Sequence, residues 1–185
     1  MALGVWQKIR LIEEKKNPWW TYRHDEVQLP NGKPGVYHYV HVNGSSMVVP
    51  VTADGRIVMV NQFRYLCARE SLEFPCGSVK DGSTYDDTAR MELAEETGCA
   101  GGTLTVVGEF NPYNGVTDEM CRVYVAADLT SARAERDETE EFEIVHLLPA
   151  EIEERIARGE LWDGMSIAAW MLAKPKVTDM LKRAR

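Results

Sequence analysis

The sequence predicts an α/β fold in which helices cover both faces of a mixed sheet, preceded by an antiparallel β meander. The chain has 185 residues, 44% of them apolar, which is enough for one domain with a sizeable core. Alternating, strand-like runs lie on both sides of a helical segment at residues 84–97, and two further helical segments close the chain. A mixed sheet between two helical layers accounts for this order.

The first forty residues predict the meander. Residues 18–29 and 36–42 alternate and are rich in aromatic and β-branched side chains, with a turn at residues 30–35 (PNGKPG). A small separate sheet is marginally stable alone, so it needs a partner surface. We therefore divide the chain into a β-rich segment at residues 1–42 and a main domain at residues 43–185.

The remaining elements follow from periodicity and from helix start and stop signals. The predicted elements are strands 46–51, 56–61, 103–110, 120–128 and 141–147 and helices 84–97, 149–158 and 164–182. Gly98 stands where a glycine ends the first helix. Pro149 suits the first position of the second helix and Gly159 suits its end. Pro175 weakens the middle of the last helix.

Composition and charge argue against several classes of protein. The net charge is −8, and residues 131–160 hold ten acidic and four basic residues, whereas nucleic-acid binding needs a basic footprint. No run of about 18 apolar residues and no signal-peptide core are present, so we expect no membrane span and no secretion. The four cysteines show no C-x-x-C spacing, which argues against a zinc site and favours the reducing cytoplasm.

Three carboxylates lie on one stripe of the helix predicted at residues 84–97. Glu92 and Glu96 are i,i+4 neighbours, and Glu92 and Glu95 are i,i+3 neighbours. Clustered anions repel each other unless a cation neutralises them, and Mg2+ or Mn2+ prefers such oxygen ligands. Taken alone, the stripe leaves open the alternative of a solvated acidic helix face.

The spacing around this stripe resembles the Nudix box, the signature G-x5-E-x7-R-E-U-x-E-E-x-G-U of pyrophosphate-cleaving hydrolases, in which U is bulky and apolar. Gly77 matches the first glycine, Glu92-Leu93-Ala94-Glu95-Glu96 the acidic core and Gly98 the last glycine. Residues 36–175 look like the ADP-ribose and nucleoside-diphosphate-sugar pyrophosphatase branch. The resemblance implies a Nudix-type α/β/α sandwich and a homodimer in which the segment 1–42 pairs with the partner subunit.

The resemblance also implies a metal site. Its cation would be Mg2+, with Mn2+ as a substitute. The ligands would be Glu92 and Glu96, with Glu95 as the third. The backbone carbonyl of Cys76 would join them, and the thiol would take no part because hard cations prefer oxygen.

Four residues outside the box are implied to bind the substrate. Arg64 would hold a phosphate with its guanidinium fork, and Glu73 stands where the family often has an acid near the substrate and metals. Glu119 ends the loop 111–119, which resembles the Pro-x-x-Gly-x-x-x-Glu loop of this branch. Tyr22, with the tryptophans before it, could offer a stacking face to a nucleobase. The alternative for Arg64 is a surface ion pair. The alternative for the loop of Glu119 is an ordinary β–β connection, and that for Tyr22 and the tryptophans is core or dimer packing.

The charge-rich run at residues 136–141 carries the predicted general base. In the ADP-ribose branch, a loop here supplies a glutamate that deprotonates the attacking water. Glu138 is the first candidate and Glu140 the second, and Glu95 inside the box is the remaining catalytic candidate. A solvated charge run is the alternative.

Two positions depart from the box. Its first glutamate falls on Ser83 and its arginine on Met91, and in the family these two residues are largely structural. Because both the acid and the base are absent, no lone charge is left buried, and Met91 can pack as an apolar filler. We therefore expect a metal-competent box. A box that has lost activity is the alternative.

The predicted function is Mg2+-dependent hydrolysis of the pyrophosphate bond of ADP-ribose or a nucleotide sugar. The products would be a nucleoside monophosphate and a sugar phosphate, and the partner a small nucleotide rather than nucleic acid or membrane. The alternative is a catalytically weak, Nudix-fold ligand-binding or sensor protein. The nucleobase, the sugar and the number of metal ions are not predicted.

Overall fold

The computed structural model describes two ranges of the chain, residues 3–132 and 142–183. The chain divides into two compact units, which we describe separately. The first unit contains Met1–Gly44 and Asn111–Met120, and the second contains Ser45–Phe110 and Cys121–Arg185. The loop predicted at residues 111–119 therefore belongs to the N-terminal unit, which its sequence does not indicate.

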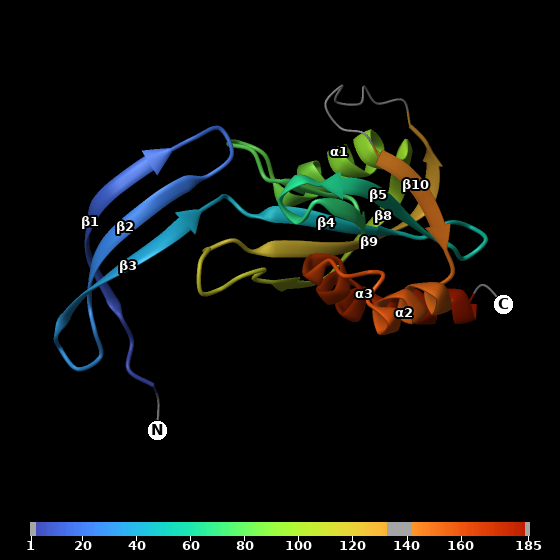
Figure 1. Cartoon of the computed structure of the whole chain (residues 1–185). Helices are drawn as coiled ribbons and strands as arrows, with labels where there is room; N and C mark the ends of the chain where they lie inside the picture. The colour runs from blue at the N-terminus through green and yellow to red at the C-terminus, as the bar shows by residue number, and fades with distance from the viewer. Residues whose placement is uncertain (1–2, 133–141, 184–185) are drawn as a thin grey trace. The chain divides into compact units, whose positions relative to one another are not determined.

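The first unit contains an antiparallel sheet in the order β1-β2-β3 (Figure 1), which confirms the predicted meander. Its strands are β1 (Gln7–Lys16), β2 (Thr21–Gln28) and β3 (Pro34–His41). The sequence pattern does not indicate β1, because charged residues interrupt its alternation. The pairing of β1 with β2 contains two register shifts. β2 begins later than predicted because the Asn17 side chain accepts hydrogen bonds from the backbone N–H groups of Trp19 and Trp20.

The second unit contains two sheets. The four-stranded sheet has the order β7-β4-β9-β8 and is mixed, because β4 and β9 pair in parallel and the other pairs are antiparallel. Its strands are β4 (Ser45–Pro50), β7 (Cys76–Ser78), β8 (Cys99–Phe110) and β9 (Cys121–Ser131). The three-stranded sheet is antiparallel, with the order β10-β5-β6. Its strands are β5 (Ile57–Arg64), β6 (Arg69–Glu73) and β10 (Phe142–Leu147).

Alternate residues of β4 and β9 pack against helices on opposite faces of the mixed sheet. Val48 and Tyr124 pack with buried residues of α1 (Tyr85–Thr97). Val49 and Val125 pack in the other cluster, which contains buried residues of α2 (Pro149–Arg158) and α3 (Gly164–Arg183). Figure 1 shows α1 on the opposite side of these strands from α2 and α3. The predicted α/β/α sandwich is confirmed.

α3 runs through Pro175 as one helix. Proline removes the hydrogen bond to the carbonyl four residues earlier, and that residue, Met171, is exposed, so water can replace the bond. Burial of Trp170, Ala173 and Val177 on both sides of the proline holds the helix together.

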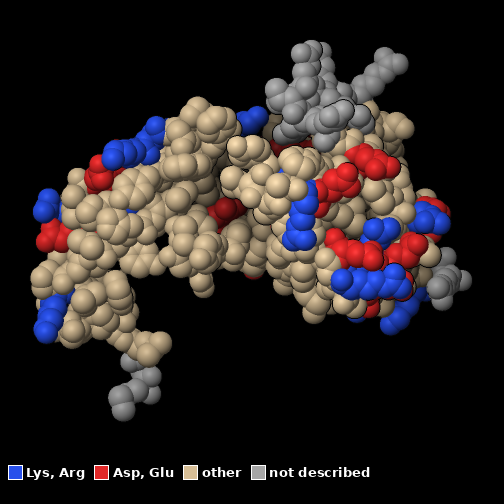
Figure 2. All heavy atoms as spheres, in the orientation of Figure 1, with Lys and Arg blue, Asp and Glu red and all other residues tan. Residues whose placement is uncertain are grey.

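The outer face of α2 and α3 is charged. Figure 2 shows acidic and basic side chains alternating over this part of the surface. The ion pairs Glu153–Lys174 and Glu154–Arg158 belong to it. In the described ranges 3–132 and 142–183, no helix is both long and apolar enough to cross a membrane.

Candidate functional site

Local signals at both ends of α1 determine which way its acidic stripe faces. Thr84 caps the N-terminus, since its Oγ1 accepts the backbone N–H of Asp87 at 3.1 Å and the Asp87 carboxylate accepts the backbone N–H of Thr84 at 3.2 Å. Gly98 ends the helix with φ 67°, as predicted, and its N–H bonds to the carbonyl of Ala94. The rotation of the helix about its axis places Glu96 at its buried edge, with 7% of its surface exposed.

Glu92 lies directly against the backbone of β7. A Cβ atom on Gly77 would lie 1.8 Å from Glu92 Oε1 and 2.1 Å from Glu92 Cδ. Gly77 does not have a positive φ, so the close approach of the carboxylate, and not a left-handed backbone, requires glycine here. Cys76 precedes Gly77 on the same short strand. The structure thus brings the Glu92 carboxylate to the strand whose carbonyl was predicted as a metal ligand.

Arg64 and Glu73 form a partly buried ion pair across the β5–β6 hairpin. Arg64 Nε lies 2.7 Å from Glu73 Oε1, and Arg64 Nη2 donates to Oε2 of the same carboxylate. Gln62 Nε2 also donates to Glu73 Oε2, at 3.2 Å. Glu73 is 5% exposed, so this acid is buried with its charge compensated. The two residues were predicted separately as substrate ligands, and the structure shows that they bind each other.

The electrostatics of Arg64 connect this hairpin with α1. Hydrogen bonding to Glu73 raises the pKa of the Arg64 guanidinium above its ordinary value, and burial opposes this effect. The charges of Glu73, Asp163 and Glu96 raise the same pKa further. Carboxylates from β6, α1 and the start of α3 therefore act on one guanidinium.

The N-terminus of α3 holds the end of β6 in place. Asp163 Oδ2 accepts the backbone N–H of Ser166 at 2.7 Å, which caps the helix. The buried Ser166 Oγ then accepts the backbone N–H of Phe74 at 3.0 Å, next to Glu73. Sequence reasoning missed Asp163. The available signal was an aspartate directly before a helical segment.

The residues around Glu92 fit a hard divalent cation in their chemistry. The described ranges show no group of three or more His, Cys, Asp or Glu side chains arranged around a common metal position. The three predicted carboxylates, Glu92, Glu96 and Glu95, are thus not gathered around one metal position in the described residues. Glu92 and Glu96, the first two predicted ligands, and the predicted backbone carbonyl of Cys76 remain as donors. All three donors are oxygens of the kind that Mg2+ and Mn2+ prefer. The glycine that makes room for the Glu92 carboxylate supports the fit, and Glu95 is half-buried on the same helix.

The two departures from the box lie in different environments. Ser83 is exposed, and its backbone N–H bonds to the carbonyl of Lys80. Met91 is half-buried on α1. Arg90, next to it, is exposed, and its guanidinium donates to the carbonyl of Gly101 at 3.4 Å.

The remaining predicted site residues lie elsewhere in the chain. Tyr22 belongs to the first unit, where its hydroxyl lies 2.7 Å from His38 Nδ1. Glu119 also belongs to the first unit, and its backbone N–H donates to Thr117 Oγ1 at 3.1 Å. Glu138 and Glu140 lie outside the described residues.

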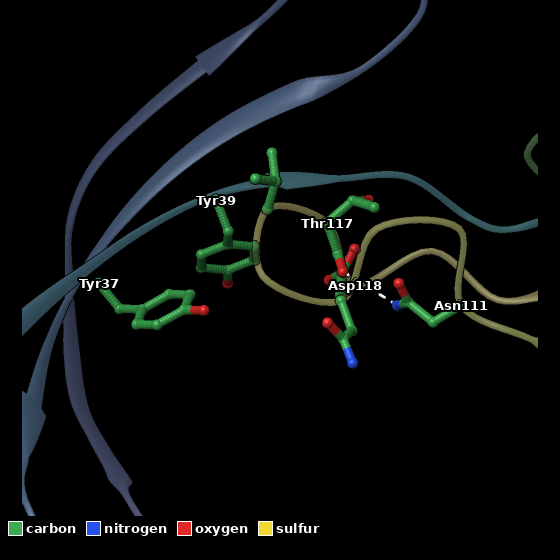
Figure 3. Close-up of a pocket in the computed structure, with 7 residues that line it drawn as sticks. Tyr37, Tyr39, Asn111, Thr117 and Asp118 are labelled. Carbon is green, nitrogen blue, oxygen red and sulfur yellow. Dashed lines mark hydrogen bonds between the residues drawn. The ribbon is translucent and has the colours of Figure 1, made fainter. Parts of the chain in front are cut away.

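The loop that contains Glu119 lines a hollow of about 440 Å³ within the first unit. Figure 3 shows the rings of Tyr37 and Tyr39, from β3, beside this loop. The Asn111 side chain donates to the carbonyl of Thr117 at 3.0 Å, and Asp118 Oδ2 lies 2.7 Å from His41 Nδ1. These contacts hold the loop in a defined conformation.

A mixed α/β/α sandwich, with an acidic helix set against a glycine in a short strand, defines the Nudix class of fold. The chain belongs to the NUDIX family, whose domain model matches residues 42–165. This confirms the family that the box resembles.

Individual relatives are consistent with this assignment. An ADP-ribose pyrophosphatase of Bacillus subtilis (strain 168) is 36% identical over 132 residues, 71% of each chain. A methanol dehydrogenase activator of Bacillus methanolicus is 31% identical over 147 residues, 78% of this chain and 80% of the relative. A crystal structure of an ADP compounds hydrolase shares the fold, with a TM-score of 0.85 and 19% identity over 97% of this chain and 98% of the other.

Proposed function

We propose that this chain is a Nudix pyrophosphohydrolase that hydrolyses the diphosphate of ADP-ribose or of a nucleotide sugar. The products are a nucleoside monophosphate and a sugar phosphate. The observation that carries the proposal is the contact of Glu92 with Gly77, because it joins the acidic stripe of the box to the strand where the box begins. The name of the relative from Bacillus subtilis supports ADP-ribose as the first substrate to test.

The cation site consists of Glu92 and Glu96, with Glu95 as a third carboxylate and the carbonyl of Cys76. The family depends on a divalent metal, and Mg2+, with Mn2+ as a substitute, suits these oxygen donors. When bound, such a cation neutralises diphosphate oxygens and lowers the pKa of water.

Other residues orient the substrate and move a proton. Arg64 presents a planar fork of donors that suits phosphate oxygens, and Glu73 orients this fork through two hydrogen bonds. Glu138 accepts the proton of the attacking water, with Glu140 as the second candidate. Tyr22 and Glu119 contribute to binding of the substrate.

The dimerisation segment in this proposal is residues 1–42, which form the small sheet of the first unit. Its small sheet leaves several large apolar side chains exposed, among them Ile9 at 55%, Val36 at 53% and Leu11 at 42%. Exposed apolar groups of this size on a three-stranded sheet favour a protein partner, and a second copy of the chain provides one. The four cysteines form no disulfide, which suits a cytoplasmic protein.

A second candidate function is ligand binding without turnover. Ser83 and Met91 favour it, because the box lacks two of its usual residues. The relative named as an enzyme activator also favours it. A turnover assay on an isosteric variant of the cation site separates the two functions.

The test replaces Glu96 by Gln and measures ADP-ribose hydrolysis over a range of Mg2+ concentrations. Loss of an anionic ligand should lower turnover at low Mg2+ by at least about 100-fold, while thermal unfolding changes little. Glu154→Gln, the same substitution on an exposed face of α2, is the control and should keep wild-type activity. Near wild-type activity of Glu96→Gln at low Mg2+ would refute the ligand assignment. A wild-type protein without turnover would favour the binding function.

A further inference from the structure

Two histidines stand next to each other on the small sheet of the first unit. His24 of β2 and His38 of β3 are direct partners across the antiparallel strands, so their side chains lie on the same face of the sheet. Their rings stack, with the ring centroids 4.0 Å apart and an angle of 22° between the planes. Histidine is the commonest metal ligand in proteins, and two imidazoles this close together can chelate one cation.

The ring nitrogens of the two histidines have different surroundings. His38 is exposed, and its Nδ1 lies 2.7 Å from the hydroxyl oxygen of Tyr22. A histidine that binds a metal typically donates its other ring N–H to such an acceptor, which leaves Nε2 of His38 for the cation. His24 Nε2 is buried and has no hydrogen-bond partner among the described residues. A buried polar atom of this kind needs a partner, and a bound ion provides one.

A carboxylate continues the row across the sheet. Glu13 of β1 is the partner of His24 on the other side of β2, so the three side chains follow one another over the three strands (Figure 1). Glu13 forms an ion pair with Lys15 at 2.8 Å, so the charge of the nearby ammonium is balanced. Among the described residues, no three His, Cys, Asp or Glu side chains surround one metal position. The two imidazoles are therefore the protein ligands, and water completes the coordination.

We propose that His24 and His38 form a binding site for a divalent transition-metal cation such as Zn2+ or Ni2+, and that Tyr22 positions His38. Imidazole nitrogens suit Zn2+, Ni2+ and Cu2+, whereas the carboxylates of the box suit Mg2+. The bound cation joins β2 to β3 and stabilises the folded sheet, because the unfolded chain does not hold the two rings together. The site goes beyond the proposed hydrolase and uses no residue of the box.

The experiment measures Ni2+ binding to the untagged full chain by isothermal titration calorimetry, with excess Mg2+ present to occupy the oxygen ligands of the box. His24→Gln and His38→Gln each remove one of two ligands and should weaken Ni2+ binding by about 100-fold or more, whereas Tyr22→Phe removes only the orienting hydroxyl and should weaken it by about 10-fold. His146→Gln is the matched control. It removes an exposed histidine of β10, in the second unit, and should bind Ni2+ like the wild type.

Thermal unfolding gives a second readout. Ni2+ should raise the unfolding temperature of the wild type and of His146→Gln, and it should leave that of His38→Gln unchanged. Because the His38 side chain is exposed, His38→Gln tests the site even if the half-buried position of His24 does not accept glutamine.

The proposal is overturned if His38→Gln binds Ni2+ as tightly as the wild type, since surface groups elsewhere would then account for the binding. It is also overturned if the wild type binds no Ni2+, or if His146→Gln loses as much affinity as His38→Gln. Unchanged binding by Tyr22→Phe would refute the positioning role of Tyr22. Because Ni2+ alone is the probe, none of these results depends on turnover, and a protein that hydrolyses nothing could still show the expected series.

Discussion

Replacement of Gly77 by Ala tests the carboxylate site with the smallest possible change. The added Cβ would lie 1.8 Å from Glu92 Oε1, 2.1 Å from Cδ and 2.8 Å from Cγ. All three atoms are at the far end of a flexible side chain, while Gly77 itself is paired with β4. Glu92 must therefore move, and the strand can stay in place.

The two expected magnitudes are very different. A Glu92 side chain forced off its rotamer costs about 0.5–1.5 kcal/mol of unfolding free energy. The loss of unfolded-state entropy offsets about 0.4–1 kcal/mol of this cost. Net destabilisation should therefore stay below about 1.5 kcal/mol. A displacement of about 1 Å in a catalytic group, by contrast, can lower the rate by about 100-fold.

The assay combines urea unfolding, ADP-ribose hydrolysis and Mn2+ binding. Gly77→Ala should unfold near the wild-type midpoint, lose about 100-fold in kcat/KM and bind Mn2+ more weakly. Gly164→Ala is the control, because its added Cβ meets no atom within 4 Å and its φ is not positive. It should keep full activity and gain up to about 1 kcal/mol of stability.

Full turnover by Gly77→Ala would refute the assignment of Glu92 as a cation ligand, since the carboxylate cannot keep its position beside that Cβ. A loss of several kcal/mol of stability with normal Mn2+ binding would show that the glycine serves packing alone.

The two remaining predictions concern the departures from the box and the general base. Met91→Arg alone should cost about 1–3 kcal/mol in thermal unfolding, because it half-buries a guanidinium without its usual partner. Ser83→Glu/Met91→Arg should be tolerated better, and equal stability of the two variants would show that these positions are not coupled. Glu138→Gln should lower kcat by about 100-fold or more with little change in KM, and Glu140→Gln should do less. If Glu140→Gln lowers kcat more than Glu138→Gln does, Glu140 is the base. If neither variant lowers kcat, the water is activated by a carboxylate of the box or by Glu119.

The sequence predicted those parts of the site that local signals determine. The ends of α1 follow from Thr84 and Gly98, and each forms its cap within four residues of chain. The stripe of Glu92 and Glu96 then follows from helical periodicity alone. The helix predicted at residues 84–97 is accordingly observed at Tyr85–Thr97. The helix predicted at 149–158, whose ends also follow from local signals at Pro149 and Gly159, is observed with the same bounds.

The parts that the sequence could not predict depend on non-local pairing. β6 and β7 are five and three residues long, and each becomes a strand only by pairing with a longer one. The bond from Phe74 to Ser166 joins residues 92 positions apart. Propensity in a short window contains no information on such contacts.

Three features of this site are unfavourable for folding when each is taken alone. Gly77 leaves a strand without a side chain, and Glu73 and Glu96 are buried acids. A chain that needed only its fold would gain stability from a larger residue in the strand and apolar residues in place of the two acids. Here the glycine makes room for a third carboxylate, and an arginine from another strand partly compensates the acids. Unfavourable choices that are spatially coordinated in this way indicate chemistry rather than packing. This argument depends on the contacts among Gly77, Glu92, Glu73 and Arg64, so it can be made only from the structure.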